Sequence, residues 1–192
     1  MEDGNVTAAA RLLMSQDSPA VPSPESLNAL NEKHPPASSS LTDLPAPQSE
    51  QCMSVNEAEV RRVVLSFPTG SAGGPDGLRP QHIRDMMCRE TGAEFLSALT
   101  DFVNLVLAGR CPSDVDPVFF GGRLLARNQK TGGIRPIAIG FTLRRLASKC
   151  ANAFGINKLT SFFYPHQLGV GTPGGCEAAV HSARRYIEAM WW

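Results

Sequence analysis

The distribution of proline limits where this chain can form regular structure. Seven of its 15 prolines fall within the first 53 residues, and a run of three serines lies among them. Proline fixes φ and has no amide donor, so long helices and paired strands are excluded there. Short helices are allowed near residues 7–14 and 25–32, but neither has enough apolar surface to fold alone. We therefore expect residues 1–53 to form a flexible, Pro- and Ser-rich, acidic tail that is disordered.

Helical periodicity begins at Ser54 and continues to Gly109. The Ser54 hydroxyl and the Glu57 carboxylate have the spacing of a capping box, which predicts a helix that Pro68 ends. Pro80 suits the first position of a second helix, and Gly109 is placed to stop a third. The side chains expected on the inner faces of these helices are Val60, Val63, Val64 and Phe67, then Ile83, Met86 and Met87, then Phe95, Leu96, Leu99, Phe102, Val103 and Val106.

The pattern changes from helical to alternating after Val118. Residues 123–127 and 134–139 are predicted to form two strands, joined by the polar, glycine-containing loop 128–133. Pro136 cannot donate to a sheet ladder, so we expect it at an edge or a bulge. Two further helices are predicted to bury, respectively, Leu143, Leu146, Ala147 and Cys150, and Val180, Ala183, Ile187 and Met190. The fold class is therefore α+β, mostly helical, with one β-hairpin.

The formal net charge of zero hides two segments of opposite sign. Up to Gln51, seven acidic residues are set against only Arg11 and Lys33. Residues 117–176 contain no Asp or Glu, and the cations there are Arg123, Arg127, Lys130, Arg135, Arg144, Arg145, Lys149 and Lys158. Such a basic segment attracts polyanions such as nucleic acid or a triphosphate, although a solvated surface also accounts for it.

The predicted hairpin is the strongest candidate for a binding site. It places the guanidinium groups of Arg127 and Arg135 on paired strands, with Lys130 at the tip. Guanidinium forks match phosphate oxygens and stay charged at any relevant pH. Because side chains alternate between faces, the two arginines share a face only if Arg127 lies opposite Arg135. The competing interpretation is an exposed edge hairpin kept soluble by positive charge.

Two glycine-rich segments could bring backbone amides to a phosphate, but each has a simpler explanation. Residues 69–77 could equally be a connector between helices. Residues 169–174 match G-x-G-x-x-G, yet a dinucleotide site needs a buried strand immediately before this motif, and residues 163–167 do not form that pattern. We therefore interpret the match as a glycine turn that enters a helix.

Several other classes of site are not indicated. The five cysteines are odd in number and contain no C-x-x-C pair, and the four histidines form no i, i+4 pair. Neither a disulfide framework nor a zinc site is therefore suggested, and reduced thiols in an intracellular protein, nuclear or cytoplasmic, are the natural expectation. No signal peptide is recognisable, and no apolar run is long enough to span a membrane.

Four segments, in order, resemble the reverse transcriptase domain of non-LTR (LINE-type) retrotransposons. Residues 71–80 (SAGGPDGLRP) resemble the Gly-Pro-Asp-Gly segment that opens this domain. Residues 125–127 (LAR) with 134–137 (IRPI) resemble its fingers hairpin, and residues 143–149 (LRRLASK) resemble the helix that follows. Residues 167–170 (QLGV) and the helix over 178–186 are similar to the segment that leads into the catalytic strand. The resemblance covers about residues 55–190.

The resemblance implies a right-hand polymerase, of which residues 54–192 would supply the fingers and the lead-in to the palm. Its partners would be an RNA template, a DNA primer and a deoxynucleoside triphosphate. By position, Arg127 and Arg135 match basic fingers residues that contact the triphosphate, although the family commonly has Lys where Arg127 stands. The further positions assigned to nucleotide or template binding are Lys130, Arg144, Arg145, Lys149 and Gln167.

The reaction of this family uses Mg²⁺ ions held by palm aspartates. The first aspartate is expected on an apolar strand beyond the last helix, and the chain stops at Trp192 before such a strand. No acid present is placed to hold paired metals, so we expect neither a catalytic residue nor a resident cofactor. The hypotheses are a polymerase fragment that is inactive alone, a non-enzymatic nucleic-acid- or nucleotide-binding module, and an unstable helical fragment without activity.

Overall fold

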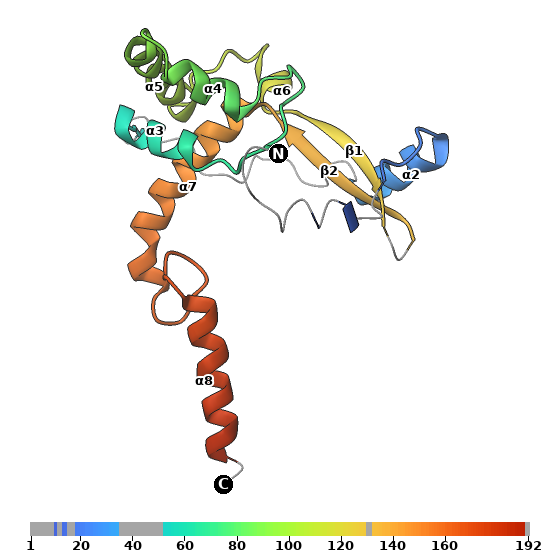
Figure 1. The fold of residues 1–192 in the computed structure, drawn as a ribbon, viewed down its shortest axis with the longest axis vertical. Helices are drawn as coiled ribbons and strands as arrows, with labels where there is room; N and C mark the ends of the chain where they lie inside the picture. Colours follow the sequence, from blue (N-terminus) through green and yellow to red (C-terminus); the bar gives the residue numbers. More distant parts are fainter. Residues whose placement is uncertain (1–9, 11–12, 15–17, 35–51, 130–131, 191–192) are drawn as a thin grey trace.

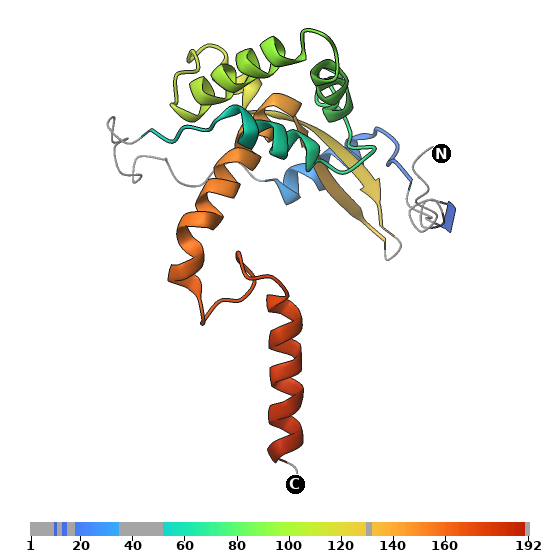
Figure 2. The same cartoon turned by 60° about the vertical axis from the view of Figure 1, so that its left-hand side comes forward.

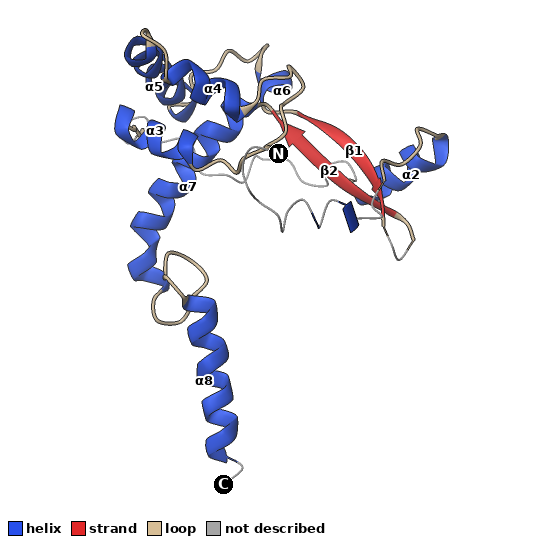
Figure 3. Ribbon diagram, in the orientation of Figure 1, coloured by secondary structure: helices blue, strands red, loops and turns tan. Residues whose placement is uncertain are grey.

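The computed structural model describes residue 10 and residues 13–14, 18–34, 52–129 and 132–190. Within these residues it contains helices α2 to α8 and one two-stranded antiparallel sheet, which confirms the expected mixed, mostly helical class (Figure 1, Figure 3). The elements are α2 (Pro24–Lys33), α3 (Glu57–Leu65), α4 (Pro80–Met87), α5 (Gly92–Leu107), α6 (Asp116–Phe119), β1 (Gly122–Asn128), β2 (Ile134–Gly140), α7 (Thr142–Phe163) and α8 (Gly175–Met190).

The core lies where α3, α4, α5 and the first half of α7 pack together (Figure 1). Val60 and Val64 of α3, Val103 of α5 and Leu146 of α7 are almost completely shielded from solvent. The predicted helical stripes supply these side chains, because residues three and four apart lie on one face of a helix. The other core residues are Val55, Val63, Phe67, Ile83, Leu99, Ala147 and Cys150.

Helix α3 starts two residues later than the capping box predicted from Ser54 and Glu57. The cap is Asn56, whose side chain accepts the Glu59 amide at 3.0 Å, while the Glu59 carboxylate accepts the Asn56 amide at 2.9 Å. The same reciprocal arrangement thus forms with the next polar pair along the chain. The prediction of a helix here was right, and the prediction of its capping residue was wrong.

The side chain of Asn104 in α5 explains why α3 does not start earlier. Its Oδ1 accepts the Val55 amide at 2.8 Å, and its Nδ2 donates to the Val55 carbonyl at 3.0 Å. Both backbone groups of Val55 are therefore bonded to α5, and the helical ladder begins at the Asn56 carbonyl, which accepts the Val60 amide. This pair also fastens the start of the folded region to the core.

The ends of α4 and α5 follow the local signals in the sequence. Pro80 occupies the first turn of α4, as predicted. Gly109 follows α5 with a φ of +66°, a conformation in which other side chains are strained. One burial prediction was wrong: Met86 is 45% exposed. Met87, one full turn after Ile83, takes the inner position instead and packs on the core.

Helix α7 joins the core through its first half, where Leu146, Ala147 and Cys150 are buried as predicted. Helix α8 extends away from the core helices (Figure 1, Figure 2). The side chains of α8 that were expected to face a core are all exposed: Val180, Ala183, Ile187 and Met190. That prediction was wrong because the apolar stripe is present but no described helix or strand packs along it.

Candidate nucleic-acid interface

The register of the hairpin places its two arginines together. Strands β1 and β2 pair residue for residue over their whole length, and Arg127 lies directly opposite Arg135. In this register both side chains project from the same face, which is the condition for a shared anion site. Gly132 and Gly133, with φ of +84° and +87°, allow the connection between the strands to close.

Pro136 lies on the outer edge of β2, as the edge prediction requires. It is opposite Ala126. The carbonyl of Ala126 and the amide of Asn128 bond to residues 20 and 18 and so point away from β2. In an antiparallel pair, two opposed residues direct their backbone groups either toward each other or both away from each other. Because Ala126 directs its carbonyl away from β2, the nitrogen of Pro136 is directed away from β1, where the sheet requires no amide donor.

The two arginines differ in exposure: Arg127 is half-buried and Arg135 is exposed. The next pair on the same face is Leu125 with Ile137, so the arginines continue an apolar strip toward the hairpin loop. Directly opposed side chains have Cβ atoms about 4.5–5.5 Å apart, so one anion beside the hairpin is within reach of both guanidinium groups. Lys130, which was expected at the tip, lies outside the described residues.

Arg144 is half-buried at the base of the hairpin. Its Nη1 donates to the Phe120 carbonyl at 3.2 Å, and its guanidinium lies so close to Gly140 that a Cβ there would collide with it. Its Nε is shielded from solvent and has no hydrogen-bond partner among the described residues. Arg144 thus links α7 to the segment before β1 and to the end of β2.

Arg145 and Lys149 lie over the same aromatic ring. The Arg145 guanidinium carbon is 5.4 Å and the Lys149 Nζ is 5.0 Å from the centroid of Phe67. Cations at this distance are attracted to the face of the ring. Arg145 also donates to the Ala72 carbonyl at 2.8 Å. Both cations therefore join α7 to the segment that follows α3, which is a structural use of the charge.

Gln167 lies in the turn between α7 and α8, where its side-chain oxygen accepts the Gly169 amide. The G-x-G-x-x-G match begins at Gly169, and it follows helix α7 and a turn rather than a strand. Gly171 and Gly174 have positive φ and lead into α8. The interpretation as a glycine turn that enters a helix is confirmed.

The Gly-rich loop over residues 69–77 packs against the junction of β2 and α7. A Cβ on Gly74 would lie 2.8 Å from the Phe141 Cα. The amides of Gly74, Gly77 and Leu78 already bond within the loop, to Leu78, Gly74 and the Asp76 carboxylate respectively. These donors are occupied, which favours the connector over a phosphate-binding loop.

The candidate metal ligands of the described residues are their His, Cys, Asp and Glu side chains. No group of three or more His, Cys, Asp or Glu side chains that could hold a metal ion occurs among them. Burial, and then the nearby Glu59 carboxylate, raise the pKa of the Cys150 thiol, so this core cysteine stays protonated at neutral pH.

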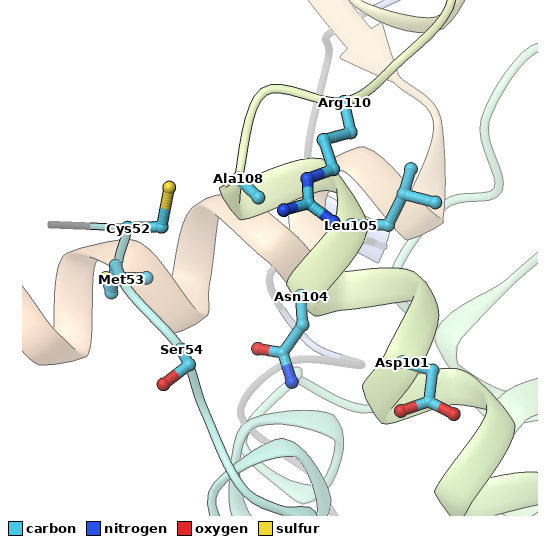
Figure 4. A pocket seen from close by; sticks show the side chains of 8 residues that line it. All are labelled: Cys52, Met53, Ser54, Asp101, Asn104, Leu105, Ala108 and Arg110. Carbon is cyan, nitrogen blue, oxygen red and sulfur yellow. The ribbon is translucent and has the colours of Figure 1, made fainter. Parts of the chain in front are cut away.

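A hollow of about 380 Å³ lies between α5 and the segment that precedes α3 (Figure 4). Its charged groups, Asp101 and Arg110, have opposite signs, so it offers no net attraction to a polyanion. The Asn104 amide, which also lines it, is bonded to Val55. The remaining lining residues are Cys52, Met53, Ser54, Leu105 and Ala108.

Sequence reasoning missed the contact between residues 18–33 and the hairpin. A short helix near residues 25–32 was allowed within a tail that was expected to be disordered, and it is present as α2 with Ser23 as its cap. Leu27 and Leu30, three positions apart on one face, were the signal that this helix had a partner.

In addition, no described helix is long and apolar enough to cross a membrane.

Comparison of the chain with protein-family models, with curated proteins and with solved structures finds no match. Support for a function therefore comes from the placement of residues alone. That placement separates the predicted site residues into two groups. Arg144, Arg145 and Lys149 join α7 to other parts of the fold, and Arg127 and Arg135 form a pair on one face of the hairpin.

Proposed function

We propose that this chain is the fingers-side portion of a reverse transcriptase similar to those of non-LTR retrotransposons, and that its hairpin binds a nucleic acid or a nucleoside triphosphate. The observation that carries the proposal is the pairing of Arg127 with Arg135 on one face. The polymerase assignment is supported by the order of the elements, since a Gly-rich loop, the hairpin and helices α7 and α8 succeed one another as the resembling segments do.

The chemistry of the arginine pair suits a phosphate group. Each guanidinium presents a planar fork of donors whose geometry matches phosphate oxygens. A phosphate has enough acceptor oxygens to bind both forks, and its negative charge offsets the repulsion between them.

Fluorescence anisotropy with a labelled single-stranded RNA, measured over a series of salt concentrations, tests the proposal. The double variant Arg127→Ala, Arg135→Ala should bind roughly 100-fold more weakly or worse, because hydrogen bonds to charged groups contribute about 1.5–3 kcal/mol each and about 1.4 kcal/mol corresponds to tenfold in affinity. The slope of log affinity against log salt should also fall by about 1.4, which corresponds to two lost contacts on a single strand.

Arg61→Ala is the matched control, because Arg61 is an exposed arginine of α3 and its loss changes the net charge by the same amount per site. The control should bind RNA nearly as the unmodified protein does. Equal affinity and equal salt slope in the double variant and the control would rule out the hairpin as the contact.

A non-enzymatic nucleic-acid-binding module is the second candidate, and the acid-free segment over residues 117–176 supports it. The two candidates differ in their response to deoxynucleoside triphosphates with Mg²⁺. A fingers site that holds the triphosphate should lose it on Arg127→Ala and Arg135→Ala, whereas a module that binds only the nucleic-acid backbone should show no saturable triphosphate binding. A primer-extension assay on an RNA template measures polymerase activity directly. We expect this activity to be absent for this chain alone.

A further inference from the structure

Residues 18–33 are bonded to both strands of the hairpin, although they precede it by about a hundred positions. On the β1 side, the Asn128 amide donates to the Ser18 carbonyl and the Ala20 amide donates to the Ala126 carbonyl, both at 3.0 Å. The Asn128 side chain also donates to the Ser18 hydroxyl at 3.1 Å. On the β2 side, Lys33 Nζ donates to the Ile134 carbonyl.

Helix α2 lies over the face of the hairpin that carries the arginine pair. Side chains at odd positions, including Leu125, Arg127 and Ile137, share that face because they alternate along paired strands. These residues line a cavity of about 850 Å³ whose other wall is formed by Leu27 and Leu30 of α2. The helix also lies beside the strands in both ribbon views (Figure 1, Figure 2).

This contact is loosely packed. Helix α2 contains no buried residue, and Leu27 is 58% exposed even though it lines the cavity. The hollow between the helix and the strands leaves part of the facing surfaces without van der Waals contact. The described hydrogen bonds of this contact lie at its two ends, and solvent can replace such bonds at low cost.

The charge of the attached segment opposes that of the face beneath it. Glu25 and Glu32 lie on α2, and residues 1–51 together carry seven acids against two bases. A polyanion that approaches Arg127 and Arg135 therefore meets a segment of its own sign on the same face.

We propose that residues 18–34 are a displaceable cover over the Arg127–Arg135 face, which competes with nucleic acid for that face. This inference rests on the proposed function of the hairpin. Binding of a polyanion requires the cover to leave, so the affinity of the intact chain is lower than that of the hairpin face itself. Displacement frees the outer edge of β1 as well, because Ser18 and Ala20 occupy it.

The double variant Ala20→Pro, Leu30→Asn in the full chain tests the cover without adding charge. Proline removes the amide that bonds to Ala126, and asparagine removes an apolar wall of the cavity. The variant should bind a labelled single-stranded RNA about tenfold more tightly than the unmodified chain, the change expected from one or two lost competing hydrogen bonds. Asn28→Ala, at an exposed position of α2, is the matched control and should leave the affinity unchanged.

Adding Arg127→Ala and Arg135→Ala to the loosened variant separates the two proposals. Loss of the gained affinity supports both. If the loosened variant binds no more tightly than the unmodified chain, while the arginine substitutions weaken both, the cover is ruled out and the hairpin function stands. If no variant shows salt-dependent binding, the hairpin function and the cover fail together.

Hydrogen exchange of the unmodified chain tests, without any substitution, whether residues 18–34 leave the hairpin when RNA binds. The amides of Ala20 and Asn128 are both bonded across the contact, so saturating RNA should speed their exchange while the core of α3 and α5 is unaffected. Unchanged protection of both amides in the RNA-bound protein would overturn the proposal.

Discussion

Arg127 and Arg135 occupy directly opposed positions on β1 and β2, so two positive charges share one rung of a two-stranded sheet. Like charges in this arrangement destabilise a strand pair. A two-stranded hairpin has little stability in reserve, and this one contributes no residue to the hydrophobic core. Two guanidinium groups on one face of the hairpin suit a phosphate, whose oxygens can accept from both of them.

Arg135→Glu tests whether the arginine pair lowers the stability of the hairpin while it raises the affinity for RNA. A carboxylate opposite Arg127 should stabilise the hairpin by about 0.2–1 kcal/mol, because attraction replaces repulsion across the strands. The same change should weaken RNA binding by more than roughly tenfold, since one cation is lost and one phosphate-repelling charge is gained. Hydrogen exchange of the β2 amides measures the first effect and fluorescence anisotropy measures the second.

Arg135→Gln is the control for that prediction, because it removes the repulsion without adding an attraction. Its hairpin stability should fall between those of the unmodified protein and the glutamate variant. Faster exchange of the β2 amides in Arg135→Glu than in the unmodified protein would contradict the account of cross-strand repulsion given above.

The two halves of α7 should respond differently to the same substitution. Leu146 is fully buried and Leu159 is 46% exposed, yet both lie on this helix. Leu146→Ala should lower the free energy of unfolding by about 2–5 kcal/mol, because it leaves a cavity in the core. Leu159→Ala should change it by less than about 1 kcal/mol. Urea unfolding followed by circular dichroism measures both, and equal losses would show that the second half of α7 is covered in solution.

Local signals in the sequence located most of the elements, because they act within a single turn or pair of strands. Pro80 and Gly109 mark helix ends through their own backbone geometry. The two strands were also located, but the sequence left their register open, and the structure shows the register that sets Arg127 opposite Arg135. The apolar spacing also identified nearly all of the core.

Contacts between distant segments could not be predicted from such signals. Asn104 bonds to Val55, 49 positions away, and this contact displaced the start of α3 from where the sequence placed it. The charges of Arg145 and Lys149 are plain in the sequence, but their common position over Phe67 is not. An apolar stripe or a charged residue in the sequence indicates that a side chain can make a contact, whereas only the fold shows which residue it contacts.

Stability should fall at alkaline pH because of Cys150. Burial raises the pKa of this thiol above its ordinary value of 9.0, so the folded protein holds the proton more tightly than the unfolded chain does. The contribution is fully present below the unfolded pKa and is lost as pH rises through the folded pKa. Urea unfolding from about pH 7.5 to about pH 10.5 should show this decline. Cys150→Ala should decline less steeply, and equal slopes would exclude the thiol as the cause.

Two glycines should respond in opposite directions to the same added methyl group. Gly155 lies inside α7, and a Cβ built there meets no atom within 4 Å. Gly155→Ala should therefore raise the free energy of unfolding by about 0.5–1 kcal/mol, because alanine loses less backbone entropy in a helix. Urea unfolding measures this gain, and a loss instead would show that the middle of α7 is crowded.

Gly74→Ala introduces the same group where the backbone has no room for it. The new Cβ would lie 2.8 Å from the Phe141 Cα and 3.1 Å from the Gly140 carbonyl oxygen. Since neither atom belongs to a flexible side chain, the Gly-rich loop must move away from the junction of β2 and α7, at a cost of about 1–3 kcal/mol. A neutral result in urea unfolding would contradict this packing. We expect a loss for Gly74→Ala alongside a gain for Gly155→Ala, because only the first Cβ meets backbone atoms.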